Sequence, residues 1–574
     1  MKNNFILFLL IINLSISLIF CQSTDSSSAT NQPSQCSTDI DLLASFSYSS
    51  YMDSMKMWMY MGRSPNELGN MEQCLMLPPN VTHYCVYQTS IVMENMTLPY
   101  VVGLCFPKSC NTTDDVQSAL NRLMMSSLII APPGSDTQTH FYTRDPPKKN
   151  WTVGAGIVLG FCVLFAILVA IGTSLELIRS YMSKLMMIEE SKEFMEGGTT
   201  VKLFLSFSLI KNCRAFMFLP ESRSFDSLDG VRVLAAIWIV ISHTGIFQLF
   251  PMSNDMEYFM AKGYKSYAYQ AINSSQYAVD LFFMITGFLV SHILLKSLES
   301  NKSRNPLFWV IWGWYLANDT QFYLIAPFVL VAYKYRKIYG YILVAILFGI
   351  SLATSIWISV ENNIVYDISV FLTPGANEIY VKPWVRIGPF AFGIALEFIY
   401  RMETTKRLYE ITLFRYIAYA FSLGLSMFLA YIQYDTYLKT WSPLIVGLYL
   451  GFSRTLFPAA ISISLLSTFY GHGGYYSKFL KLSCFRYLSK LTFAMYLINP
   501  IVIYSYNYSR TSIPHYSVIE HSYQVTSNLV FTILLSIILH LTVEKPFVNL
   551  QRILLPTNTK NNNNNKPTNP ANKV

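Results

Sequence analysis

The sequence predicts an all-α polytopic membrane protein of about 10–11 transmembrane helices, preceded by a small, disulfide-bonded and mainly helical domain. Hydrophobic residues make up 52% of the 574 residues and charged residues only 13%, whereas soluble globular proteins carry about 25% charged residues. Apolar runs of membrane-spanning length fill the chain after Trp151. Cysteines and glycosylation sequons gather before Trp151, as is typical of a domain in an oxidising compartment.

The first residues resemble a secretory signal. The stretch MKNNFILFLLIINLSISLIFCQS has one lysine and an apolar run too short for a comfortable membrane span, and polar residues follow it. We expect residues 1–21 to be a signal peptide that is cleaved near Cys21 or Gln22. An uncleaved anchor is the alternative, because the small-residue cleavage motif is poor. Either segment would deliver the next residues to the lumen or to the cell exterior.

The segment that follows, residues 22–150, has the composition of a lumenal or extracellular cysteine domain. Its odd number of cysteines leaves one thiol outside the pairs, and spacing alone does not assign the connectivity. The stretch YMDSMKMWMYMGRSP is expected to be helical. The disulfide candidates are Cys36, Cys74, Cys85, Cys105 and Cys110, and the glycosylation candidates are Asn80, Asn95, Asn111 and, in a later loop, Asn273.

Apolar runs after Trp151 predict the membrane spans. The first transmembrane helix, 151–176, leads into a basic linker, 177–224, which the positive-inside rule places in the cytosol. The same rule explains the net charge of +9 without nucleic acid, because Lys and Arg gather in short loops and in the tail. The Asn-rich tail, 551–574, is expected to be cytosolic and disordered. The runs lie at 152–176, 230–250, 278–296, 307–333, 338–358, 383–399, 411–431, 447–470, 491–506 and 523–543.

One apolar run, SLDGVRVLAAIWIVISHTG, carries two ionisable residues with ten residues between them, Arg232 and His243. Charged side chains are costly inside a bilayer, so residues of this kind usually have a function. A helical rise of about 1.5 Å per residue places His243 roughly 16 Å beyond Arg232. If Arg232 marks the cytosolic face, His243 lies near the middle of a hydrocarbon layer about 30 Å thick.

The cysteine motifs resemble those of a known family. The strings GNMEQCL, HYCVYQ and GLCFPKSC, in this order, resemble the extracellular N-terminal domain of the nose resistant to fluoxetine proteins. The resemblance implies that residues 22–150 are a lumenal or extracellular module attached to an acyltransferase-like membrane domain. It implies no catalytic role for the module itself.

A second resemblance covers residues 225–550. The strings FDSLDGVRVLAAIWIVISHT, AVDLFFMITGFLV, WGWYLANDTQFYLIAPF, IYVKPWVRIGPFAFG and LTVEKPF, in this order, resemble the acyltransferase 3 family of membrane O-acyltransferases. An arginine and a histidine separated by ten residues are the catalytic signature of that family, and Arg232 with His243 match it. The family's ten-helix transmembrane domain, with the preceding span, implies eleven helices, one more than the apolar runs found here.

The expected position of the missing helix coincides with a short connection near residues 296–316. Basic residues flank both ends of the run 307–333, so both ends are expected at the cytosolic face, which a single span cannot satisfy. Family members have a cytosolic segment with two spaced arginines, another helix and a lumenal loop where this chain has only KSLESNKSRNPLFWV. Either a missing exon or a true deletion explains the difference. A true deletion would remove arginines that the family is thought to use for the acyl donor.

The Arg232 and His243 pair suits acyl transfer. Neutral His243 can accept a proton from an acceptor hydroxyl as that oxygen attacks a thioester. Arg232 and the neighbouring Asp229 lie where the phosphates of cytosolic acyl-CoA approach, and a guanidinium binds phosphate well. Each residue also has a structural alternative: hydrogen bonding of His243 to a neighbouring helix, snorkelling of Arg232, or helix capping by Asp229.

Further ionisable residues are expected near the lumenal ends of their spans, where they would line the entry of the acceptor or form structural ion pairs. These residues are Asp280, Asp319, Arg386 and Arg454. His540 is expected to hydrogen-bond Glu544 one turn further along its helix, and we place it outside the site. The sequence shows no metal-ligand spacing, so we expect no metal and no tightly bound cofactor.

These observations predict a multi-pass protein of the secretory pathway or plasma membrane, with a lumenal or extracellular N-terminal domain and a cytosolic tail. The favoured function is that of an O-acyltransferase, which transfers groups other than aminoacyl groups from acyl-CoA to a hydroxyl of a lipid, sterol or glycan. The alternative is a non-catalytic membrane protein, a pseudoenzyme, for lipid or small-molecule handling or transport. The expected partners are the lipid bilayer, acyl-CoA and the acceptor, and no nucleic acid.

Overall fold

The structure is a computed structural model, and contacts divide the chain into two compact units that are described separately. One unit comprises 25–149 and 221–533, and the other comprises 1–24, 150–220 and 534–574. The expected signal peptide, Asn95 and most of the tail lie outside the described residues. The described residues are 35–62, 67–93, 96–123, 138–142, 152–185, 198–219, 225–249, 264–299, 317–366, 378–509 and 517–554.

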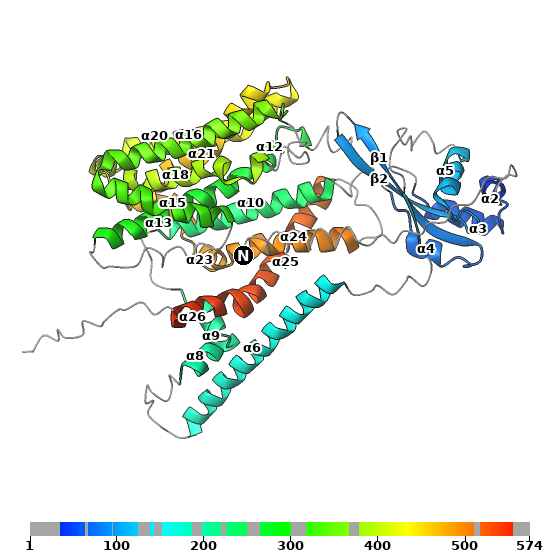
Figure 1. The fold of residues 1–574 in the computed structure, drawn as a ribbon, viewed down its shortest axis with the longest axis horizontal. Helices are drawn as coiled ribbons and strands as arrows, with labels where there is room; N and C mark the ends of the chain where they lie inside the picture. Colours follow the sequence, from blue (N-terminus) through cyan, green and yellow to red (C-terminus); the bar gives the residue numbers. More distant parts are fainter. Residues whose placement is uncertain are drawn as a thin grey trace, which may run out of the picture. The chain divides into compact units, whose positions relative to one another are not determined.

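The N-terminal module contains a three-stranded antiparallel sheet with the strand order β2-β1-β3 (Figure 1). Tyr84 and Cys85 are neighbours in β1 and point to opposite faces of the sheet, yet both are buried. The sequence analysis did not predict this sheet, because strands buried on both faces form continuous apolar runs without alternation. The elements are β1 (Thr82–Met93), β2 (Met96–Pro107), β3 (Gln138–Tyr142), α2 (Gln35–Ala44), α3 (Tyr51–Tyr60), α4 (Met71–Leu75) and α5 (Thr113–Arg122).

Two disulfides connect the parts of this module. One joins Cys74 of α4 to Cys105 of β2, and the other joins Cys36 of α2 to Cys110, which lies between β2 and α5. Cys85 is unpaired and fully buried, so the expectation of one leftover thiol is confirmed. Burial raises the pKa of the Cys85 thiol, which keeps it protonated and unreactive.

The glycosylation candidates differ in their surroundings. Asn80 and Asn111 are exposed, whereas Asn273 is half-buried. The side-chain amide of Asn273 donates a hydrogen bond of 3.4 Å to the carbonyl oxygen of Tyr264. Exposed side chains are accessible to a modifying enzyme, so Asn80 and Asn111 are the better-placed candidates, and their modification stays a prediction.

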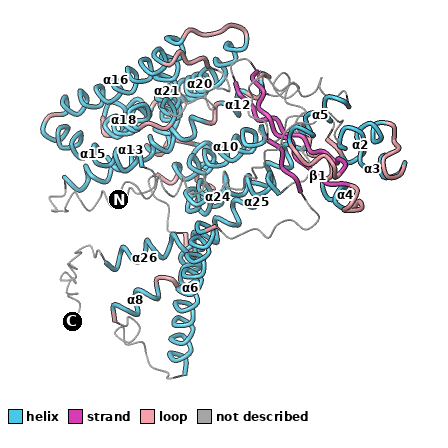
Figure 2. Tube along the Cα trace, turned by 45° about the vertical axis from the view of Figure 1, so that its right-hand side comes forward, coloured by secondary structure: helices cyan, strands magenta, loops and turns pink. Residues whose placement is uncertain are grey.

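The fold class of a polytopic helical membrane protein is confirmed: the described residues of each of the ten apolar runs overlap a helix, and Figure 2 shows that helices make up most of the chain. Residues 307–316 of the fourth run lie outside the described residues. Eight helices in the described part of the chain are long and apolar enough to cross a membrane. α15 and α18 are not among these eight, and each contains a proline. The ten helices are α6 (Val153–Leu185), α10 (Ser227–Leu249), α13 (Gln276–Glu299), α15 (Ala317–Tyr335), α16 (Lys337–Glu361), α18 (Pro383–Tyr400), α20 (Thr412–Tyr431), α21 (Pro443–Phe469), α24 (Thr492–Ser509) and α25 (Val518–Leu539).

Helices α13 and α18 run in the same direction. Asp280, near the start of α13, pairs with Arg386, near the start of α18, and His292 and Glu397 pair further along the same two helices. The helices also touch closely along this interface. A Cβ atom on Gly393 would lie 2.2 Å from the carbonyl oxygen of Met284, so the contact requires glycine.

Helix α15 runs parallel to these two helices. Asn318, near its start, donates to the carbonyl oxygen of Val381 at 2.8 Å, and Lys334, near its end, donates to that of Leu298 at 2.5 Å. Val381 immediately precedes α18 and Leu298 lies near the end of α13, so the start of α15 and the end of α13 are at opposite ends of the bundle. Parallel neighbours of this kind fit the expectation that one crossing is absent before α15, which itself stays a prediction.

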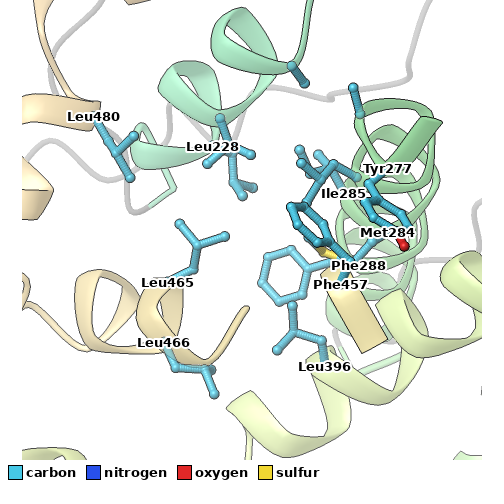
Figure 3. Packing of buried hydrophobic residues seen from close by; sticks show 14 of the residues in the cluster. Leu228, Tyr277, Met284, Ile285, Phe288, Leu396, Phe457, Leu465, Leu466 and Leu480 are labelled. Atoms are coloured by element: carbon cyan, nitrogen blue, oxygen red, sulfur yellow. The ribbon is translucent and has the colours of Figure 1, made fainter. Parts of the chain in front are cut away.

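A buried apolar cluster joins α10, α13, α18 and α21 (Figure 3). Leu228 of α10, Phe288 of α13 and Leu465 of α21 are among its buried members. The hydroxyls of Ser227 in α10 and Thr468 in α21 lie 2.8 Å apart and fix these two helices at one level. Short helices follow the main ones in this unit: α12 (Gln270–Asn273), α19 (Glu403–Glu410), α22 (Gly474–Leu480) and α23 (Ser483–Leu488).

The smaller unit joins α6 to the C-terminal helical segment through two short helices, α8 (Thr199–Leu205) and α9 (Leu209–Met217). Fully buried Asn212 of α9 donates to the carbonyl oxygen of Leu541 at 3.2 Å. Leu541 lies in a π-helical turn, His540–Glu544, that leads into α26 (Lys545–Leu554). Nδ1 of His540 lies 2.9 Å from the carboxylate of Glu544, as the sequence predicts.

The N-terminal module should lose stability below neutral pH because of His83. Burial lowers the pKa of His83 to about 4 from the ordinary 6.5. Between these two values the unfolded chain binds a proton that the folded module does not, so stability falls as the pH drops through that window. The hydrogen-exchange protection factors of the module within the full chain, corrected for the intrinsic exchange rate at each pH, should therefore fall between pH 7 and pH 4.5. His83→Gln should remove most of that fall, and an unchanged pH dependence of the protection factors in the variant would contradict this assignment.

Candidate active site

His243 lies on α10, where its ring is held by an amide from a distant part of the chain. Nδ1 of His243 is 2.6 Å from Oδ1 of Asn499 on α24. The Asn499 amide nitrogen donates to two backbone carbonyls of its own helix, those of Met495 and Tyr496, at 2.8 and 2.9 Å. The amide oxygen must therefore face the histidine, and an oxygen only accepts. His243 consequently carries its proton on Nδ1 and presents the lone pair of Nε2.

The histidine turn of α10 is anchored at further points. Thr244 is fully buried and accepts a hydrogen bond of 3.1 Å from the amide of Asn528 on α25. Asn507 on α24 donates to the backbone carbonyl of Phe247 at 3.2 Å. Phe247 also stacks on Tyr504 with ring centroids 4.6 Å apart. These contacts fix the orientation of His243, and in the described part of the chain no hydrogen bond occupies its Nε2.

The sequence alone did not predict that these asparagines contact α10. Asn499 lies within the apolar run FAMYLINPIVIY, where a polar residue is costly and therefore informative. The run does not reveal which helix its amide faces, so the pairing with His243 becomes visible only in the folded chain.

Arg232 and Asp229 share a face of α10 with His243. Eleven steps of about 100° bring His243 to within about 20° of Arg232 around the helix axis. Arg232 and Asp229 approach each other to 4.0 Å, and both side chains are partly exposed. The rise from Arg232 to His243 is roughly 16 Å, so the two cannot contact one atom of a substrate. They can contact the two ends of an extended molecule.

Three of the four residues expected near the span ends meet in one buried cluster. Asp280 and Arg386 form an ion pair of 2.7 Å, with 0% and 2% of their side chains exposed. Arg386 also donates to the carbonyl oxygen of Tyr380 at 2.7 Å. Arg454 is 2% exposed and donates to the carbonyl oxygen of Ile379 at 2.6 Å. The side chain of Asp319 lies outside the described residues.

Asp280 and Arg386 lie near the starts of α13 and α18, and Arg454 lies in the middle of α21. Ser227 and Thr468 are in contact, and from this common level His243 is sixteen residues along α10 and Arg454 fourteen residues back along α21. These steps correspond to roughly 24 Å and 21 Å of helix. The three clustered residues are therefore at about the depth of His243.

Loss of Arg386 should destabilise the protein strongly. Arg386→Gln leaves the carboxylate of Asp280 buried without its cation, which costs about 3–5 kcal/mol. A lower thermal unfolding temperature of the purified full chain would show this. The double variant Asp280→Asn/Arg386→Gln should recover most of the loss, since both charges are then absent. Equal instability of the single and double variants would show that the ion pair is not the cause.

Comparison with known proteins agrees with these features. Residues 225–308 match the family model described as acyltransferase domain, and the match ends inside the short connection at 296–316. The chain is 22% identical over 580 aligned positions to nose resistant to fluoxetine protein 6 of Caenorhabditis elegans, covering 82% of this chain and 69% of that protein. No solved structure matches the chain significantly. The chain is thus similar to the acyltransferase 3 family over the first part of its membrane bundle, and over most of its length to a nose resistant to fluoxetine protein.

Proposed function

We propose that the protein is a membrane O-acyltransferase that moves an acyl group from acyl-CoA to a hydroxyl of a lipid, sterol or glycan. The observation that carries this proposal is the His243–Asn499 pair, which leaves Nε2 as a free base. A histidine held in one tautomer by an oxygen acceptor on Nδ1 is arranged as general bases are in other acyl-transfer sites.

The proposed acyl transfer balances in atoms and protons with the groups present. Nε2 of His243 takes the proton of the acceptor hydroxyl while that oxygen attacks the thioester carbonyl carbon. The new ester bond forms, the carbon–sulfur bond breaks, and the departing CoA thiolate takes the proton back from His243. No additional reactant is required.

Arg232 is suited to the other end of the donor. The pantetheine arm of CoA separates its phosphates from the thioester, and Arg232 is on the same face as His243 but about 16 Å away along α10. The guanidinium of Arg232 approaches Asp229 to 4.0 Å, and a guanidinium is suited to binding phosphate. We therefore assign Arg232 to the phosphates, Asp229 to orienting Arg232, and His243 to the thioester.

The proposal includes an orientation. The start of α10, with Arg232, faces the cytosol, where acyl-CoA is made, and the N-terminal module and the opposite ends of the spans face the lumen or cell exterior. Basic residues at the ends of α13 and α15, such as Lys296 and Lys334, support this direction under the positive-inside rule. We place the protein in the secretory pathway or plasma membrane.

Replacing His243 tests the catalytic role. Membranes with the full chain should transfer label from acetyl-CoA or palmitoyl-CoA to endogenous acceptors, and His243→Ala should lower the rate by about 100-fold or more. His472→Ala is the matched control, because His472 is exposed. Transfer that is equal in the two variants, or absent from wild type with both donors, would favour the non-catalytic alternative.

The hydrogen-bond partner should control kcat and leave KM unchanged. Asn499→Leu keeps the volume but removes the acceptor for Nδ1, so the proton of His243 distributes between both nitrogens and kcat falls by about tenfold or more. The control is Asn362→Leu, whose amide bonds only its own helix at the end of α16. Kinetics with palmitoyl-CoA would measure both parameters, and a change confined to KM would contradict the positioning role.

A further inference from the structure

The buried cluster of Asp280, Arg386 and Arg454 holds two cations and one anion. Among the described residues, no second carboxylate lies within salt-bridge distance of either arginine. Arg386 is paired, so the charge of Arg454 is the uncompensated one. An isolated charge out of water is costly, and proteins normally neutralise it.

Two atoms of the cluster also lack hydrogen bonds. Within the described residues, Nε of Arg454 has no acceptor and Oδ2 of Asp280 has no donor, although both atoms are buried. Buried polar atoms are satisfied in the great majority of cases, so unsatisfied ones indicate a missing polar group. The first atom calls for an acceptor and the second calls for a donor.

The cluster is also placed where a substrate would be needed. It is at about the depth of His243, and aromatic contacts link the two regions through the bundle. Trp238 of α10 lies 5.8 Å from Phe457 of α21, which in turn stacks on Tyr277 of α13 at 4.5 Å. Tyr277 is one turn from Asp280 on the same helix.

We propose that this cluster binds an anionic group that carries a neighbouring hydroxyl, as in a glycerophosphate, with Arg454 neutralising the anion and Asp280 accepting from the hydroxyl. The assignment of this group to the acyl acceptor rests on the proposed function, whereas its binding does not. The ligand would thus belong to the class of phosphate-bearing polyols, either as a lipid headgroup or as a free molecule.

Thermal unfolding of the purified full chain tests the binding. Phosphatidylglycerol nanodiscs should raise the unfolding temperature of wild type above that in phosphatidylcholine nanodiscs by more than about 2 °C. Arg454→Gln should abolish this rise, whereas Arg407→Gln, which removes an exposed positive charge, should retain it. A rise with soluble glycerol 3-phosphate as well would identify the headgroup alone as the ligand, and a rise with phosphatidylglycerol alone would identify the lipid.

The unfolding temperature without the anionic lipid distinguishes a binding site from a charge with a purely structural role. Arg454→Gln loses the hydrogen bond to Ile379 but also removes a charge that no described carboxylate pairs with, so it should lower the unfolding temperature in phosphatidylcholine by much less than Arg386→Gln does. A fall as large as that of Arg386→Gln would show that the protein already neutralises Arg454 and would overturn the proposal. Equal shifts in wild type and Arg454→Gln, or no shift with either probe, would also overturn it.

The His243→Ala variant distinguishes the anion site from the proposed acyltransferase function. His243→Ala should keep the shift with phosphatidylglycerol, because His243 is not part of the cluster. A shift in a wild-type protein that shows no transferase activity would leave the anion site standing and refute the acyltransferase function. Transferase activity without any shift in the unfolding temperature would support the acyltransferase function and refute the anion site.

Discussion

Buried polar groups in the membrane bundle must find partners inside the chain, and this constraint organises the structure. An unsatisfied polar group in hydrocarbon costs several kcal/mol. Three asparagines on α24 and α25 meet this demand around α10, and the Asp280–Arg386 pair meets it between α13 and α18. The interactions that orient His243 are therefore the same kind that hold neighbouring helices together.

The helical part of the fold was largely predictable, because lipid requires long apolar helices and leaves few alternatives. The described residues of all ten apolar runs overlap helices. The sheet of the N-terminal module was not predictable in the same way, since Tyr84 and Cys85 are both buried and their strand shows no alternation. The odd cysteine followed from counting, but its identity as Cys85 required the folded module.

The candidate site was likewise predictable only in part. Helical rise and periodicity were enough to set the spacing of Arg232 and His243, because both belong to one helix. Asn499 and the depth of Arg454 depend on how separate helices are staggered, which no local pattern encodes. The contact between Ser227 and Thr468 supplies that stagger. It places the arginine cluster at about the level of the histidine.

The close contact at Gly287 and Gly393 restricts how the bundle can change shape. A Cβ on Gly287 would lie 2.3 Å from the carbonyl oxygen of Phe390, so the two backbones interlock without side chains that could yield. Sliding of α13 against α18 would bring the Cβ atoms of neighbouring residues against the backbone that the glycines accommodate, which opposes a shear motion at this interface. A hinge motion that carries α13 and α18 together avoids this clash.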